Sequence, residues 1–373
     1  MEQLQKPVRR QSNIELLRII CMLMIIAHHF SVHSGFDFSA DPLSLSRVWT
    51  QVLWSGGKVG VDVFVLISGY FLVSGKSMKI SKILVFWLQI FTYSAVIFLI
   101  FLLCGKTEVN GYTLRTYLLP VSFEGWWFVS AYFVMLVMSP FINRFLHALT
   151  ARAYRLFLLI ATVFWVLIPT VFVEKSYFFS NWEYNSAVWF LYLYALAGYI
   201  RLHGLPQRRK PGTLILAAAV IWALTMGITV MLDYAAVNNP IYVQHETHLF
   251  EMQSLPTVLI SVLLLVAFQR IKLGYSKLIN TVSSLTFGVY LLHDNKLFRE
   301  VLWKQWVPGT ASVGTWKLVV VPLIAIPCVF ILGAVVEFLR SRLLERAYAG
   351  PLGRLAEKVQ QPIDRYFRRR HGA

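Results

Sequence analysis

Charged residues are scarce in this chain of 373 amino acids. Asp, Glu, Lys and Arg make up 14% of it, whereas a soluble protein of this size carries about 25%. The apolar residues, 57% of the total, come in blocks of about twenty along the whole chain, the length that crosses a bilayer. These features exclude a soluble enzyme and a disordered protein, and they predict an all-α integral membrane protein.

Cysteine is equally rare, and its pattern excludes disulfide-stapled folds. Cys21, Cys104 and Cys328 all fall in apolar blocks, with no CxxC pair and no Cys/His spacing typical of a metal site. Isolated cysteines of this kind usually pack as small apolar side chains, so we predict no disulfide and no metal. The first apolar block is followed by no small-residue cleavage site, so we expect it to remain as a membrane anchor.

The apolar blocks predict about ten transmembrane helices between a short N-terminus (1–13) and a basic tail (340–373). A single membrane domain (14–339) therefore accounts for nearly the whole chain, in which we find no repeat and no low-complexity tract. The predicted helices cover 14–33, 56–73, 83–104, 126–147, 154–174, 186–203, 213–232, 255–269, 281–302 and 316–339.

Lys and Arg outnumber Asp and Glu by 35 to 18. With the N-terminus in the cytoplasm, 25 of these basic residues fall in inner segments and nine in outer ones, and Arg18 alone lies inside a span. Cytoplasmic loops of membrane proteins carry such an excess, so we predict that both termini are cytoplasmic. The basic excess then reflects topology and contact with anionic membrane lipid rather than nucleic acid, which we exclude as a partner.

The first predicted helix carries ionisable side chains that a bilayer disfavours. Arg18 and His29 are eleven residues apart, which places them on one helix face and about 16 Å apart along the axis. Glu15 lies three residues before Arg18, close enough to pair with its guanidinium. His28 projects about 80° away from the Arg18 face. In the alternative, purely structural interpretation, Arg18 reaches the inner headgroups and His29 is a satisfied core imidazole.

Four segments resemble, in order, motifs of the acyltransferase family 3 membrane proteins. Arg18 and His29 match the family's R-x10-H signature, and Glu15 fits the acidic residue three positions before its Arg. GVDVFVLISGYFL resembles the family's second helix, WWFVSAYF the aromatic start of its fourth, and SLTFGVYLLHD its S-x-G-hydrophobic-Y-hydrophobic-x-H element. The matching positions in these three segments are Gly60, Phe64, Ser68, Gly69, Trp127, Phe128, Ser284, Gly288, Tyr290 and His293.

The resemblance implies an enzyme that transfers an acyl group, usually acetyl from cytoplasmic acetyl-CoA, to a hydroxyl of a glycan. The acceptor would be a surface, exported or lipid-linked glycan, and the location a cell membrane, such as the plasma membrane of a bacterium. Larger family members carry an added extracytoplasmic esterase-like domain, which these 373 residues do not contain. We therefore expect the membrane domain alone to complete the transfer.

Attack of a hydroxyl on a thioester needs a base, and histidine suits that role near neutral pH. Burial in an apolar helix favours a neutral imidazole, so His29 is the predicted catalytic residue. It would act as the base, or as a nucleophile that forms an acyl-imidazole. Arg18 lies nearer the cytoplasmic face, where its guanidinium could bind a CoA phosphate. Its alternative role is a structural pair with Glu15.

Three residues of the second helix are further candidates. Ser68 and Gly69 are predicted to bind the acyl donor, through a hydroxyl or amide beside the thioester carbonyl. Close helix packing is the alternative for this small pair. Asp62 either pairs with Lys58, four residues earlier, or faces the acceptor.

Aromatic and histidine side chains later in the chain are candidate acceptor contacts. Trp127 and Phe128 form either a sugar-stacking wall or an interfacial aromatic belt. Tyr290 and His293 lie one turn apart, and we expect them near the depth of His29.

The outer-loop segment HETHLFE offers a possible metal site through His245, Glu246, His248 and Glu251. No further ligands are obvious nearby, so we interpret it as a solvated loop rim.

Two other functions compete with acyl transfer. Ten helices with charge inside the membrane would also suit an exporter of a polysaccharide or lipid-linked sugar, although the lack of an internal repeat disfavours common transporter architectures. A membrane-sensing module for a partner enzyme is the second alternative. The shared face of Arg18 and His29 favours chemistry over both.

The ten-helix topology predicts that residues 105–125 and 233–254 face outside while both termini face the cytoplasm. A cysteine introduced at position 240, in a background without the three native cysteines, should react with an impermeant thiol reagent from outside. Labelling of that cysteine only from inside would contradict the topology, because the charge distribution depends on the alternation of the helices.

Overall fold

The computed structural model describes residues 10–39, 41–75, 79–123, 125–172, 185–205, 209–239 and 247–368, with the backbone alone at 346–349 and 363–368. Across these ranges the chain is helical and contains no strand. The predicted N-terminus up to residue 9, the last five residues of the tail and position 240 lie outside the described residues.

Eight helices in the described part are long and apolar enough to cross a membrane. Six are single helices: α1 (Ser12–His33), α2 (Leu45–Leu72), α3 (Ile80–Leu103), α5 (Trp127–Ala148), α9 (Pro211–Asn238) and α13 (Lys317–Arg340). In the seventh, α6 (Ala151–Thr162) continues through a π-turn into α7 (Ile168–Val171). The eighth is α10 (Leu255–Arg270), which a 3-10 turn at His248–Phe250 precedes. The chain is therefore an all-α integral membrane protein.

The two other predicted spans are helices as well, but they lie inside the bundle. α8 (Ser186–His203) packs between α2 and α5, and α11 (Lys277–His293) packs against α1 and α13. Neither is among the eight apolar spans: α11 has only 17 residues, and α8 has 18 with Arg201 and His203 in its last turn. The count of ten spans and the cytoplasmic placement of the termini remain predictions.

Two helix boundaries differ from the sequence-based prediction. α2 begins at Leu45 rather than near residue 56, because the Ser44 hydroxyl caps it by accepting a hydrogen bond from the Arg47 amide. The ninth predicted helix does not continue to residue 302. It ends at His293, and the side chain of Asn295 caps a new short helix, α12 (Lys296–Val301). This break leaves Asp294 between two helix ends.

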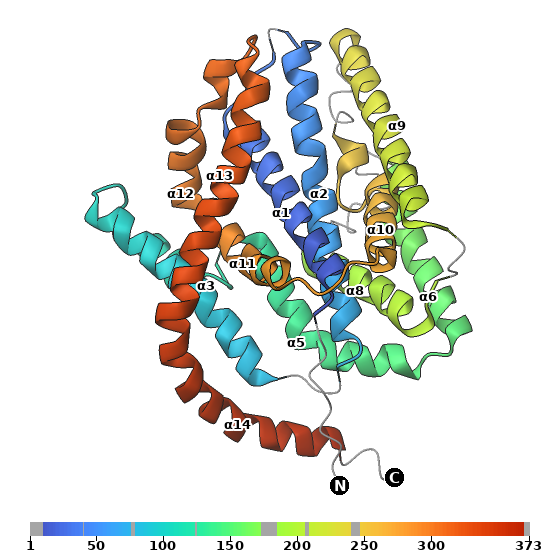
Figure 1. Ribbon diagram of the computed structural model, residues 1–373, viewed down its shortest axis with the longest axis vertical. Coiled ribbons are helices and arrows are strands. Elements are labelled where there is room, and N and C mark those ends of the chain that lie inside the picture. Colours follow the sequence, from blue (N-terminus) through green and yellow to red (C-terminus); the bar gives the residue numbers. More distant parts are fainter. Residues whose placement is uncertain are drawn as a thin grey trace.

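Two further helices lie in a connection between spans and in the C-terminal tail. α4 (Gly111–Leu118) lies in the predicted outer loop, closed by a capping box between Asn110 and Thr113. The basic tail forms α14 (Arg346–Arg368), which Figure 1 shows lying across the lower end of the molecule at an angle to α13. An amphipathic helix in that position fits the surface of a membrane.

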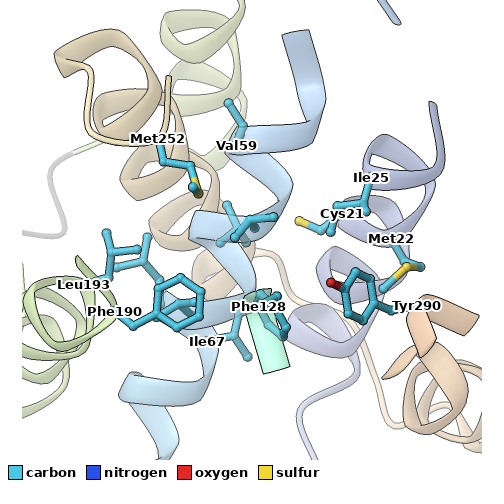
Figure 2. Close-up of a cluster of buried hydrophobic side chains, with 14 of the residues drawn as sticks. Cys21, Met22, Ile25, Val59, Ile67, Phe128, Phe190, Leu193, Met252 and Tyr290 are labelled. Atoms are coloured by element: carbon cyan, nitrogen blue, oxygen red, sulfur yellow. The ribbon is translucent and has the colours of Figure 1, made fainter. Parts of the chain in front are cut away.

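α1 and α2 lie side by side in the middle of the bundle, with α3, α12 and α13 on one side and α6, α9 and α10 on the other (Figure 1). Buried apolar side chains fill the space around them. Figure 2 shows Cys21 and Ile25 of α1, Ile67 of α2, Phe128 of α5 and Tyr290 of α11 in one such cluster.

Glycines let α2 approach its neighbours closely. A Cβ at Gly60 would lie 2.9 Å from the Cys21 carbonyl oxygen of α1. At Gly69 it would lie 2.9 Å from Cα and 3.1 Å from the carbonyl oxygen of Tyr194 in α8. Both obstacles are backbone atoms, which cannot move aside as a flexible side chain could.

A buried polar cluster fixes α13 against α3 and α11. The Glu337 carboxylate accepts hydrogen bonds from Gln89 at 3.0 Å, from the Tyr93 hydroxyl at 2.9 Å, and from Nε and Nη2 of Arg340 at 2.8 Å each. Gly288 of α11 packs directly on this carboxylate, which leaves no room for a side chain.

We expect Gly69→Ala to destabilise the protein by about 1–3 kcal/mol, because the added methyl group meets the backbone of α8. Gly227, inside α9, offers a matched control: nothing among the described residues lies within 4 Å of the place that an added Cβ would take. Gly227→Ala should be neutral or stabilising through helix propensity. Thermal unfolding in detergent would compare the two, and equal midpoints for both variants would contradict the close packing of α2 on α8.

Candidate functional site

The site centres on the C-terminal half of α1, where its histidines meet the end of α11. The imidazole of His29 is 12% exposed, and that of His293 is buried. Nδ1 of His29 lies 2.9 Å from Nε2 of His293. The two residues are 264 positions apart in the chain, so tertiary packing alone brings them together.

The hydrogen bonds of His293 determine which nitrogen of His29 is free. Nδ1 of His293 lies 2.6 Å from the Val289 carbonyl oxygen, and a carbonyl only accepts, so this nitrogen carries the proton. In the neutral ring, Nε2 of His293 is then an acceptor, and His29 must donate from its Nδ1. This arrangement leaves Nε2 of His29 with an unprotonated lone pair.

A carboxylate lies beside that lone pair. Oδ1 of Asp294 is 3.9 Å from Nε2 of His29, 3.7 Å from Nε2 of His33 and 3.4 Å from Nη1 of Arg299. Asp294 is buried and stands here because α11 ends at His293. The sequence analysis did not single out Asp294, His33 or Arg299 as site residues. The spacing of four residues between His29 and His33 could have pointed to His33, whereas nothing in the pattern showed that the ninth helix would stop before Asp294.

Nearer the start of α1, Arg18 and Glu15 form the predicted ion pair. Nη1 of Arg18 is 2.8 Å from Oε2 of Glu15, and the same oxygen accepts a hydrogen bond from the Ser283 hydroxyl of α11. The Arg18 side chain is 21% exposed. Ser283 thus gives another polar contact between α1 and α11. The sequence analysis named its neighbour Ser284, which is exposed, and missed Ser283, which is buried.

Ser68 faces the interior and is joined to a residue of α5. Its hydroxyl lies 3.0 Å from the Phe64 carbonyl oxygen and 2.9 Å from the Tyr132 hydroxyl. Ser68 and Tyr132 therefore form a polar contact between α2 and α5, and Tyr132 is a residue that the sequence analysis did not single out.

Gly69 and Asp62 lie on other faces of α2. Gly69 contacts the α8 backbone, as described above, so close packing explains it. Asp62 is fully buried and accepts a hydrogen bond of 3.0 Å from Nε1 of Trp189 in α8. Its other oxygen has no partner among the described residues. The alternative partner of Asp62, Lys58, lies 3.8 Å from Glu251.

The predicted aromatic residues divide into one buried and one exposed ring. Phe128 is buried, stacks on Tyr132 with ring centroids 5.5 Å apart, and meets Tyr290 at 5.4 Å. Tyr290 lies 6.4 Å from the ring of His29. Trp127 is 43% exposed on the outside of α5. Figure 2 shows Phe128 and Tyr290 in the same buried cluster. Their ring contacts extend the site from His29 toward Tyr132, whereas the exposed Trp127 does not line it.

His28 has a structural environment despite its place beside His29. Its Nδ1 donates to the Trp54 carbonyl oxygen of α2 at 2.8 Å, and Gly57 packs on its ring. Of the outer-loop residues weighed as metal ligands, His245 and Glu246 lie outside the described residues. His248 bonds to the Thr170 carbonyl oxygen.

Comparison with known proteins agrees with the motifs. A family model described as "Acyltransferase domain" matches residues 11–339, nearly the whole chain. No curated protein and no solved structure matches significantly.

Proposed function

The chain belongs to this acyltransferase family, and from its site we propose an O-acyltransferase that uses cytoplasmic acyl-CoA. In this proposal the acyl group, acetyl in the first instance, passes to a hydroxyl of a surface, exported or lipid-linked glycan. The observation that carries the proposal is Nε2 of His29, which the His293 contact leaves unprotonated, in a side chain that is 12% exposed.

His29 acts as the base in this mechanism. As the acceptor oxygen attacks the thioester carbonyl, its proton moves to Nε2 of His29. The tetrahedral intermediate then collapses, the C–S bond breaks, and the proton passes from His29 to the departing CoA thiolate. The ester and free CoA are the products, and His29 returns to its neutral form.

Asp294 stabilises the protonated state of His29 that forms on the way. The carboxylate and Nε2 are 3.9 Å apart, where opposite charges attract by about 4 kcal/mol at an effective dielectric constant of about 20. His293 is a positioning residue, because it holds the His29 ring in the tautomer that exposes Nε2. Nucleophilic attack by the same lone pair, through an acyl-imidazole, would need the same arrangement.

Arg18 is suited to an anionic ligand because its guanidinium is only partly used. Arg340, the comparable arginine of α13, gives Nε and Nη2 to Glu337 and is 6% exposed. Among the described residues, Arg18 donates only from Nη1, to Glu15, and its side chain is 21% exposed. Its remaining N–H groups can bind a phosphate of acyl-CoA. Gly57 of α2 packs on His28, and Ser68 lies eleven residues, about 16 Å, farther along the same helix. In this proposal the hydroxyls of Ser68 and Tyr132 therefore contact the acyl donor away from its thioester.

The acceptor lies on the outer side of His29 in this proposal. The rings of Phe128 and Tyr290 form an aromatic wall beside the imidazole, and a sugar ring can stack on such a wall. Asp62 and Trp127 do not contact the acceptor in this proposal. Asp62 faces α8, and Trp127 is exposed on the surface of the helix bundle.

We expect His29→Ala to lower acyl transfer by roughly 10²–10⁴-fold, the usual contribution of a general base, while the protein still accumulates in the membrane. His28→Ala is the matched control one position away. It should lower thermal stability, because His28 joins α1 to α2, yet keep most of the transfer per folded molecule. Transfer and melting temperature measured on the same preparations separate the two effects, and equal loss of transfer in both variants would refute the role of His29.

We expect Arg18→Lys to weaken acyl-CoA binding by about tenfold or more, since lysine keeps the charge but not the planar fork. The measurement is acetyl-CoA binding to purified protein in nanodiscs. If Arg18 only reached the headgroups, lysine would do so equally well and affinity would not change.

Glycan acetylation in a deletion strain and its parent tests the acceptor class. We expect the loss of acetylation to be restored by wild-type protein and not by the His29→Ala variant. Unchanged acetylation, together with no detectable acetyl-CoA binding by the wild type, would favour the exporter instead.

A further inference from the structure

Three side chains beside the catalytic centre form a ligand set that the sequence alone did not reveal. Nε2 of His29, Nε2 of His33 and an oxygen of Asp294 all lie within 4.8 Å of one another. The two histidines are four residues apart on α1, a spacing that places both imidazoles on one helix face. The carboxylate comes from the end of α11. Two imidazoles and one carboxylate are a common set of protein ligands for zinc.

The hydrogen bonds behind His29 prepare it as a ligand. A histidine that binds a metal usually donates its second ring N–H to a fixed acceptor, which sets the tautomer and aims the ring. His29 donates from Nδ1 to His293, and the Val289 carbonyl fixes His293 in turn. The lone pair on Nε2 of His29 is therefore directed toward the same space as Asp294.

The distances are close to those that a metal requires. With bonds of about 2.0–2.1 Å to tetrahedral zinc, ligand atoms lie about 3.4 Å apart. Asp294 Oδ1 is 3.9 Å from His29 Nε2 and 3.7 Å from His33 Nε2, and all three ligand atoms lie within 4.8 Å of one another. Side-chain shifts of up to about 1.4 Å would therefore place the three ligands at three corners of the tetrahedron. The side chains of His29 and His33 are 12% and 22% exposed, which gives an ion access from solvent.

We propose that His29, His33 and Asp294 bind one Zn²⁺ ion, and that the bound ion blocks acyl transfer by occupying Nε2 of His29. Neutral imidazoles and a carboxylate bind without releasing a proton, and water or chloride fills the fourth position. Arg299, 3.4 Å from Asp294, opposes the added positive charge. Binding is consequently weaker than at a closed structural zinc site and reversible by chelators. The blocking effect rests on the proposed function, whereas the binding does not.

The test uses full-length protein purified in detergent without a histidine tag and stripped with EDTA. Calorimetric titration with Zn²⁺ should give one ion per chain, and Co²⁺ should give the visible absorption bands of a four-coordinate site. His33→Ala should lower the zinc affinity at least tenfold. His33→Gln, which keeps the size of the side chain, guards against a folding defect. His203→Ala, at an exposed histidine at the end of α8, is the matched control and should bind like the wild type.

The binding measurement tests the zinc site, and the transfer measurement separately tests the proposed role of His29. No zinc bound by the wild type beyond background, or equal affinity in the wild type and both His33 variants, would overturn the site. In the transfer assay, zinc should inhibit the wild type and EDTA should restore it, whereas the His33 variants should resist inhibition. If zinc binds through His33 but the loaded protein transfers acyl groups at full rate, the metal site stands and the role of His29 in the proposed function falls.

Discussion

The hydrogen bond between the imidazoles of His29 and His293 is the contact on which the site depends. A histidine pair has several possible proton arrangements, and the Val289 carbonyl reduces them to one for the neutral pair. Because the interior is poor in water, leaving these groups unpaired would be costly, so the arrangement is held firmly. The tautomer of His29 therefore depends on α11 as much as on α1.

A second polar contact keeps the first in register. Glu15 of α1 accepts a hydrogen bond from Ser283 of α11, about three to four turns below the histidine pair on each helix. Two contacts at separate heights define how far one helix can slide along the other. The same Glu15 holds Arg18, so the element that sets the register also places the cation of the site.

The two arginine–glutamate pairs within the bundle differ in how many hydrogen bonds they make. Glu337 and Arg340 saturate each other with hydrogen bonds from Gln89 and Tyr93, as burial at low dielectric demands. Arg18 is left partly unused and partly exposed. Both are arginine–glutamate pairs three residues apart, and the smaller number of hydrogen bonds at Arg18 is what supports its proposed role in binding an anion.

The sequence by itself determined the membrane class, the helical periodicity and the shared face of Glu15, Arg18 and His29, because these depend on local composition and on 3.6 residues per turn. It predicted Ser68, Phe128, Tyr290 and His293 only through motifs. Tertiary structure alone decided their partners. Ser283, Tyr132 and Asp294 join the site from distant positions in the chain, and Asp294 does so because α11 stops one residue earlier. Gly69 and Asp62 proved to face α8. Periodicity gives the relative directions of side chains on one helix but not which neighbour each face meets, and that choice is made by the packing of the whole bundle.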